Sequence, residues 1–202
     1  MNKKIENFFQ SQIEEHIHVV RRTSKYMEKD FVKLVDICFE SVNNGNKIIF
    51  FGNGGSASDA QHLSTELTVR YSKDRKSIPA ISLSTDTSAL TAIGNDLGFE
   101  LIFSRQLEAL GKTGDVAIGI STSGKSKNVI NGLAYSKKNG IKTVIFTGKD
   151  THNIEKLADV IISIPTKVTS RIQEAHILIG QMLCNALEYR LGLAPLVKED
   201  VK

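Results

Sequence analysis

The stretch Lys47-Ile-Ile-Phe-Phe-Gly-Asn-Gly-Gly-Ser-Ala57 joins a short apolar run to a glycine-rich turn. Its first five residues are typical of a buried strand, and residues 57–70 have the length and composition of a helix. Glycine in the turn would let a phosphate approach the backbone, where the free N–H groups and the dipole at a helix N-terminus favour an anion. Strand, turn and helix in this order predict the first unit of an α/β fold.

Four further runs have the same aliphatic and β-branched character, each bounded by Gly, Pro, Ser or Asp: residues 79–83, 115–120, 142–146 and 160–164. Helix-length segments separate or follow them: residues 87–93, 101–110, 126–139, 153–157 and 170–191. Strands that alternate with helices imply right-handed crossovers and a parallel sheet covered on both faces. We therefore predict an α/β fold with a doubly wound, five-stranded parallel sheet.

The N-terminal region shows apolar residues at helical spacing over residues 5–20 and again over 31–42, which predicts a pair of helices. We expect one domain over residues 1–202. Residues 1–45 would form the N-terminal helices, 46–192 the α/β core with the final helix, and 193–202 a tail. The N-terminal and final helices have more apolar surface than a lone domain of this size needs, which predicts a homo-oligomer.

Composition excludes several classes of protein. The 26 basic and 22 acidic side chains give a net charge of +4, and the basic residues are spread out, which is typical of a solvated surface rather than a nucleic-acid interface. No apolar run has the length of a membrane span. Cys38 and Cys184 lie in apolar stretches without metal-ligand spacing, so we expect buried, reduced thiols. A cytoplasmic location follows, with no direct binding of nucleic acid or membrane.

The first turn, Gly52-Asn-Gly-Gly-Ser-Ala57, matches the GxGxxG/A pattern of dinucleotide-binding folds. Such a site also needs an acidic residue at the end of the next strand. That strand ends at Leu83, and Asp86 comes too late and is better placed to begin a helix. A nicotinamide cofactor is therefore not expected.

The second turn, Gly119-Ile-Ser-Thr-Ser-Gly-Lys-Ser126, matches the P-loop pattern literally. A P-loop needs an aspartate at the end of a neighbouring strand to hold magnesium, and none of the other strands supplies one. No nucleotide cofactor is expected. The hydroxyl groups and backbone N–H groups could instead surround one phosphate monoester, although a plain turn of small residues is the alternative. The hydroxyls belong to Ser121, Thr122, Ser123 and Ser126.

Proton chemistry could come from the helix after the first turn, where His62 and Glu66 are four residues apart and share a face. An imidazole and a carboxylate at this spacing can bind a divalent metal or transfer a proton together, but surface pairs of this kind are also common. Asn95 and Asp96 could reach substrate hydroxyls or simply form a turn. Gln173 could act in the site or form a helix-capping box with Ser170.

Taken together, these segments resemble the phosphoheptose isomerases, which convert sedoheptulose 7-phosphate to a heptose 7-phosphate on the sugar isomerase (SIS) fold. The resemblance covers nearly the whole chain in order. Its segments are Gly52-Asn-Gly-Gly-Ser-Ala-Ser-Asp-Ala-Gln-His62, Glu66-Leu-Thr-Val-Arg-Tyr71, Gly94-Asn-Asp-Leu-Gly-Phe99, Gly114-Asp-Val with Ile120-Ser-Thr-Ser-Gly-Lys-Ser126, Thr147-Gly-Lys-Asp150 and Arg171-Ile-Gln-Glu174.

The resemblance implies a role for each matching residue. Glu66 would move a proton between carbons 1 and 2 through an enediol, with Gln173 as a further catalytic and substrate-binding residue. In metal-dependent members, zinc is bound by the equivalents of His62, Glu66 and Gln173 and by a histidine eight residues further on. Asn95 and Asp96 would bind the sugar chain. The substrate and its phosphate would be held by Asn53, Gly54, Gly55, Ser56, Ser121, Thr122, Ser123 and Ser126.

This chain departs from the family pattern at position 181, where glutamine replaces the histidine that acts as a second acid/base and fourth metal ligand. An amide cannot exchange a proton near neutral pH. His176 is not a replacement, because family members have a histidine there as well. The main prediction from the sequence is that the turn at Gly52, the turn at Ser121 and the side chain of Glu66 surround a single phosphorylated ligand.

A second branch of the same fold is a non-catalytic, tetrameric bacterial protein that binds the replication initiator DnaA. The chain resembles it at Leu83-Ser-Thr-Asp86, Leu90-Thr-Ala-Ile93, Ser170-Arg-Ile-Gln-Glu174 and position 181. Glu66 and the intact turn at Gly52 favour the isomerase. A DnaA adaptor is the alternative hypothesis and a regulatory sugar-phosphate sensor a third, and the resemblance implies a homotetramer with sites completed by a neighbouring subunit.

Overall fold

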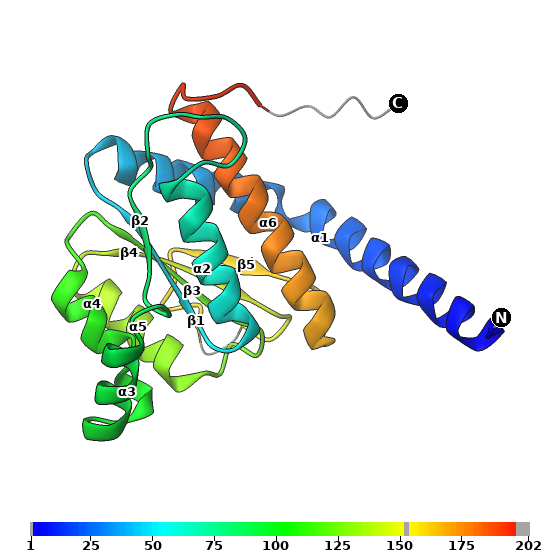
Figure 1. Ribbon diagram of the computed structural model, residues 1–202, viewed down its shortest axis with the longest axis horizontal. Coiled ribbons are helices and arrows are strands. Elements are labelled where there is room, and N and C mark those ends of the chain that lie inside the picture. The colour runs from blue at the N-terminus through cyan, green and yellow to red at the C-terminus, as the bar shows by residue number, and fades with distance from the viewer. Residues whose placement is uncertain (1, 152–153, 197–202) are drawn as a thin grey trace.

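The computed structural model describes residues 2–151 and 154–196 and contains a five-stranded, all-parallel sheet in the order β2-β1-β3-β4-β5 (Figure 1). The predicted fold class is confirmed. The strands are β1 (Ile48–Gly52), β2 (Ala80–Ser82), β3 (Val116–Ser121), β4 (Lys142–Thr147) and β5 (Val160–Ser163). Because β1 lies between β2 and β3, the chain reverses its direction of winding there, and such reversal points are where open α/β sheets bind ligands.

Helices cover both faces of the sheet. They are α1 (Lys3–Asn43), α2 (Gly55–Thr68), α3 (Thr87–Asp96), α4 (Ser104–Leu110), α5 (Lys127–Lys138) and α6 (Thr169–Arg190), with a 3₁₀ turn over Phe99–Leu101. Successive side chains of a strand point to opposite faces, so β1 contributes to two cores. Ile48 and Phe50 pack with α1, α2 and α6, whereas Ile49 and Phe51 pack with α4 and α5.

The N-terminal region corrects one prediction, because the expected pair of helices is a single 41-residue helix, α1. Residues 21–30 contain no glycine or proline to end a helix. The buried stripe continues through them, since Val19, Thr23 and Met27 follow one another at four-residue steps. The polar residues of this stretch therefore lie on the solvent face of one continuous helix and do not mark a break between two helices.

Three local expectations also differ from the structure. The helix expected over 153–157 is absent over its described part, since residues 154–157 form turns and residue 153 lies outside the described residues. The N-cap of α6 is Val168, so Ser170 lies inside the helix and the expected capping box is not formed. The expected tail is described only as far as residue 196.

Within the part of the chain that the structure describes, no helix could cross a membrane. Cys38 and Cys184 are buried and free, as predicted, and burial raises the pKa of both thiols.

His176 is fully buried in α6 and its ring Nε2 lies 3.1 Å from the carbonyl oxygen of Thr147 at the end of β4. A carbonyl only accepts hydrogen bonds, so Nε2 bears the proton and Nδ1 has no partner. Burial lowers the pKa of His176 to about 4, against the raising effect of the bond to Thr147. His176 therefore anchors α6 to the sheet as a neutral imidazole.

This pKa makes stability depend on pH. An unfolded histidine titrates near pH 6.5, so stability from the neutral ring is fully present above that pH and is lost as the pH falls towards 4. We expect the free energy of unfolding, measured with urea, to fall more between pH 7 and pH 5 in the native protein than in His176→Gln, which cannot titrate. An equal fall in both proteins would contradict this assignment.

Candidate active site

The glycine-rich turn and the serine-rich turn meet at the carboxyl edge of the sheet. Their strands are neighbours, with Gly52 of β1 in register with Ile120 of β3. The Asn53 amide donates to Asn128 Oδ1 at 2.9 Å, and the Asn128 amide donates back to Asn53 Oδ1 at 2.8 Å. This reciprocal pair fastens the first turn to the start of α5, which confirms that the two turns converge.

The serine-rich turn has the geometry of an anion cradle. Ser126 is the N-cap of α5, and its hydroxyl lies 3.1 Å from that of Ser121, so both hydroxyls border the N-terminus of the helix. Gly124 has a φ of +65°, which glycine adopts without strain, and Ser123 Oγ accepts from the N–H of Lys125. Helix N–H groups and the dipole favour an anion at this position.

A small hollow beside this turn is lined by Thr122, Ser123, Asp150 and three lysines, namely Lys125, Lys149 and Lys167. The three ammonium groups outnumber the one carboxylate and give the approach to the turn a positive potential, which attracts phosphorylated ligands.

Helices α2 and α6 run side by side and parallel (Figure 1). Gln173 near the start of α6 lies against Gly55 at the start of α2, and Gly180 lies against Leu63 further along both. The two contacts follow the same order in both helices. The pairing thereby places functional side chains of α6 opposite those of α2.

Three polar side chains meet midway along this pair. His62 Nε2 lies 2.9 Å from Glu66 Oε1 and 3.0 Å from the amide nitrogen of Gln181. A protonated Nε2 can donate to the Glu66 carboxylate but cannot accept from an amide N–H. With Glu66 ionised, the single proton of Nε2 is donated to the carboxylate, and a Gln181 turned to present its carbonyl oxygen could only share that proton. Gln181 thus occupies the position next to the His62–Glu66 pair that the family pattern assigns to a histidine.

Gln173 does not join this cluster within one chain. It is eight residues before Gln181 on the same helix, about 12 Å along the axis, and its amide lies beside Gly55. The described residues contain no group of three or more His, Cys, Asp or Glu side chains placed to hold a metal. Of the four positions that the resemblance implies for zinc, only His62 and Glu66 are residues of these types, and the other two are glutamines.

Two other sets of predicted residues are spread along the chain. Glu66 lies eleven residues after Gly55, about 16 Å along the helix axis, so the carboxylate and the phosphate turn lie at different levels of α2.

Asn95 and Asp96 end α3, where both are exposed and the Asn95 amide donates to Asp96 at 2.7 Å. Their roles in binding the sugar chain stay predictions. Ser56 is buried in the first turn of α2, and its role in binding the phosphate also stays a prediction.

Sequence reasoning missed several residues near these groups. Asp59 lies one turn before His62 on α2; burial raises its pKa to about 6, and the nearby His62 opposes the shift. Because Asp59 and His62 are three residues apart on one helix, their spacing in the sequence could have indicated Asp59. Asn128 partners Asn53 from a helix far along the chain, and no sequence signal points to that pair. The same is true of Arg75 and Glu188, which are 113 residues apart and form a buried ion pair.

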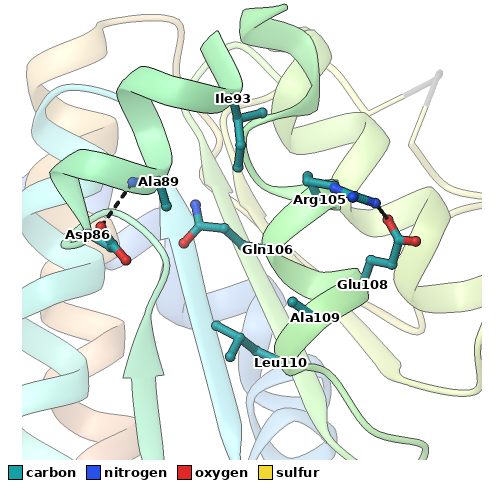
Figure 2. A pocket seen from close by; sticks show the side chains of 8 residues that line it. All are labelled: Asp86, Ala89, Ile93, Arg105, Gln106, Glu108, Ala109 and Leu110. Carbon is teal, nitrogen blue, oxygen red and sulfur yellow. Dashed lines mark hydrogen bonds and ion pairs between the residues drawn. The ribbon is translucent and has the colours of Figure 1, made fainter. Parts of the chain in front are cut away.

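A separate cavity of about 530 Å³ lies between α3 and α4, away from the cluster on α2 (Figure 2). Gln106 extends into it, and its amide donates to the backbone oxygens of Leu83 and Ile102. Arg105 and Glu108 pair at its rim. The hydrogen bond from Gln106 to Leu83 holds α4 to the end of β2. None of the predicted site residues lines the cavity.

Comparison with known proteins decides the family. Residues 11–148 match the SIS domain family. Over 185 residues the chain is 50% identical to the phosphoheptose isomerase of Paramagnetospirillum magneticum, covering 92% of this chain and 96% of that protein. The chain belongs to the phosphoheptose isomerases of the SIS-domain family.

Other phosphoheptose isomerases agree. That of Nitratiruptor sp. is 55% identical over 152 residues, which cover 75% of this chain and 81% of that protein. The solved structure from Neisseria gonorrhoeae superimposes with a TM-score of 0.86 at 37% identity, covering 92% of this chain and 99% of that one. The structure from Francisella tularensis gives 0.88 at 28% identity, covering 94% and 100%.

The contact between Gly55 and Gln173 provides a test in this phosphoheptose isomerase. A Cβ at position 55 would lie 2.5 Å from Gln173 Nε2 and would displace the amide, whereas a Cβ at Gly94 meets nothing within 4 Å. Small misplacements in a site can be very costly. We expect Gly55→Ala to lower kcat/KM for sedoheptulose 7-phosphate at least tenfold, with the thermal midpoint nearly unchanged. Gly94→Ala, in which the added Cβ contacts no neighbouring atom, is the matched control. Full activity of Gly55→Ala would show that the Gln173 position is not needed.

Proposed function

We propose that this protein is an aldose–ketose isomerase that converts sedoheptulose 7-phosphate to D-glycero-D-manno-heptose 7-phosphate. The observation that carries the proposal is the meeting of the Gly52 and Ser121 turns at one sheet edge, next to a helix that bears the His62–Glu66 pair. An anion cradle and a proton-transferring carboxylate are the two parts that isomerisation of a phosphorylated sugar requires. The membership in the phosphoheptose isomerases supports the same reaction.

The phosphate would bind at the N-termini of α2 and α5. The positive ends of the two helix dipoles favour an anion there, and the hydroxyls of Ser121 and Ser126 lie at the border of α5. The three lysines beside the turn would raise the local concentration of the anionic substrate. Binding the phosphate away from the reacting carbons supplies energy for orienting them.

Glu66 is the base of the proposed reaction. Its carboxylate would remove the proton from carbon 1 of the ketose, and the same proton returned to carbon 2 of the enediol gives the aldose. His62, 2.9 Å from Glu66, orients the carboxylate and can pass a proton between the two substrate oxygens. Gln181 can donate or accept a hydrogen bond at this place but cannot carry the proton.

We also propose that zinc binds at this site, but we assign it no step of the reaction. His62 and Glu66 are suitable ligands, Gln181 supplies an amide, and Gln173 of the same chain lies at another level of the helix pair. Turnover with and without added zinc decides whether the metal takes part.

Assembly as a homotetramer would bring together groups that lie apart along α2 and α6 of one chain. Gln173 and Gln181 lie about 12 Å apart along one straight helix, and the proposed assembly would bring side chains of a second copy beside both of them. The apolar side chains of α1 are available for such contacts, because the helix projects from the body (Figure 1) with Ile5, Phe8, Phe9, Ile13 and Ile17 at 41–61% exposure. We propose that these side chains pack against other copies and that the assembly completes each site.

The family membership favours the isomerase over the DnaA-binding adaptor. We further propose that the enzyme works in the cytoplasm and supplies heptose for cell-surface polysaccharide such as lipopolysaccharide. A DnaA pull-down tests the alternative directly, and retention of DnaA together with no turnover would favour it.

Removal of the proposed base tests the reaction. General-base catalysis is worth about 10²–10⁴-fold in rate, so we expect Glu66→Gln to lose at least 100-fold in kcat while still binding sedoheptulose 7-phosphate. The control is Glu108→Gln, which removes an exposed carboxylate from α4. Native protein that fails to turn over sedoheptulose 7-phosphate with or without zinc would overturn the isomerase, and an active Glu66→Gln would overturn the role of Glu66.

The oligomeric state is tested by light scattering. We expect a mass four times the 22.2 kDa of one chain. The double substitution Phe8→Asp with Ile13→Asp places charges on the exposed apolar face of α1 and should shift the protein to smaller species with lower activity. A native monomer would contradict the proposed assembly.

A further inference from the structure

A buried ion pair lies at the far end of the α2–α6 contact. Arg75, in the segment between α2 and β2, donates from Nε to Glu188 Oε1 of α6 at 2.7 Å. The two side chains are 2% and 0% exposed. Neither belongs to the cluster described above, and their function is not explained by binding or proton transfer.

The remaining nitrogens of Arg75 hold the last turn of α2. Nη2 donates to the backbone oxygen of Glu66 at 2.8 Å, and Nη1 donates to that of Leu67 at 2.7 Å. Carbonyls at the end of a helix have no partner within it, and a cation there complements the negative end of the dipole. One guanidinium therefore fixes the backbone of Glu66 itself.

Glu188 is held as firmly on the other side. It accepts from the N–H of Tyr71 and from the hydroxyl of Ser72, both at 2.9 Å, as well as from Arg75. Burial alone would raise the pKa of Glu188, but these hydrogen bonds and the charge of Arg75 together lower it. The carboxylate is therefore ionised and fully partnered.

The position of Glu188 on α6 connects this pair to the cluster. Gln181, Cys184 and Glu188 follow one another at three- and four-residue steps, so they share the face that meets α2. Gln181 contacts His62, and the Cys184 thiol lies 4.0 Å from the Leu63 carbonyl oxygen. Arg75 and Glu188 form the last contact of this series.

We propose that Arg75 and Glu188 are positioning residues that set the carboxylate of Glu66 and the ring of His62 in place against Gln181. The guanidinium links the backbone of Glu66 to a side chain of α6, so the two helices cannot slide past each other at the level of the cluster. The proposal rests on the proposed function, in which Glu66 is the base. Buried ion pairs add little net stability compared with apolar residues of the same volume, so a positioning role and a stabilising role predict different behaviour of variants.

Three variants separate the two roles. Arg75→Lys keeps the charge beside Glu188 but lacks the planar fork whose separate nitrogens reach Glu188 and both backbone oxygens. The double variant Arg75→Met with Glu188→Met removes both charges together and leaves no unpaired ion in the core. Arg190→Gln is the matched control, because it breaks an exposed ion pair of α6 with Asp36 on α1, two residues after Glu188 and outside the site.

The thermal midpoint, kcat and KM are measured for each variant at a temperature where all are folded. We expect Arg75→Lys and the double variant to fold and to lose 10- to 100-fold in kcat with little change in KM, because the phosphate turn is untouched. Arg190→Gln should keep the native kcat. A folded double variant or Arg75→Lys with native kcat would overturn the proposal, whatever its thermal midpoint.

Amide hydrogen exchange provides a readout that does not depend on turnover. We expect Arg75→Lys to increase exchange in the last turn of α2, residues 65–69, and Arg190→Gln to leave it unchanged. If the native protein shows no isomerase activity, the proposed function fails, and increased exchange alone still shows that Arg75 holds the end of α2. Unchanged exchange in Arg75→Lys would overturn the positioning role in either case.

Discussion

The site depends on the close parallel packing of α2 against α6, and two glycines make that packing possible. A Cβ at Gly180 would lie 2.5 Å from Leu63 Cδ1, and one at Gly55 would lie 2.5 Å from Gln173 Nε2. Interiors are packed densely, so an added carbon would have to displace the Gln173 amide at Gly55 or the buried Leu63 side chain at Gly180. The contacts that Gln173, Gln181 and Cys184 make with α2 depend on this small separation of the helices.

The sheet and the helix pair contribute different parts of the chemistry. The change of winding direction between β1 and β3 brings two turns together and leaves the N-termini of α2 and α5 directed at one edge, which suits an anion. Glu66 and His62 lie further along α2, where α6 rather than the sheet surrounds them. The proposed anion site thus depends on the topology of the strands, and the proposed proton-transfer site on the register of two helices.

Sequence reasoning predicted what local patterns determine. Apolar runs with small residues at their ends indicated all five strands, and the turns at Gly52 and Ser121 were identified from composition alone. Helix breaks were predicted less well, because the polar residues 21–30 look like a linker although Thr23 and Met27 continue the buried stripe of α1. The pairs Asn53–Asn128 and Arg75–Glu188 could not be predicted, since they join segments 75 and 113 residues apart through side chains that local patterns do not distinguish.

The rigidity of α6 constrains how any complete site is built. Gln173 and Gln181 are held about 12 Å apart along the axis of a regular helix, and α2 separates Gly55 from Glu66 in the same way. The spacing of these four residues within one chain is therefore fixed by two helices and not by loops, and the exposed apolar face of α1 lies on a helix that extends from the body (Figure 1). Substitution of histidine by Gln181 changes the proton chemistry at one level of the helix pair but leaves this spacing intact. The geometry of the helix pair and the acid–base chemistry of its side chains are consequently separable, and each can change without the other.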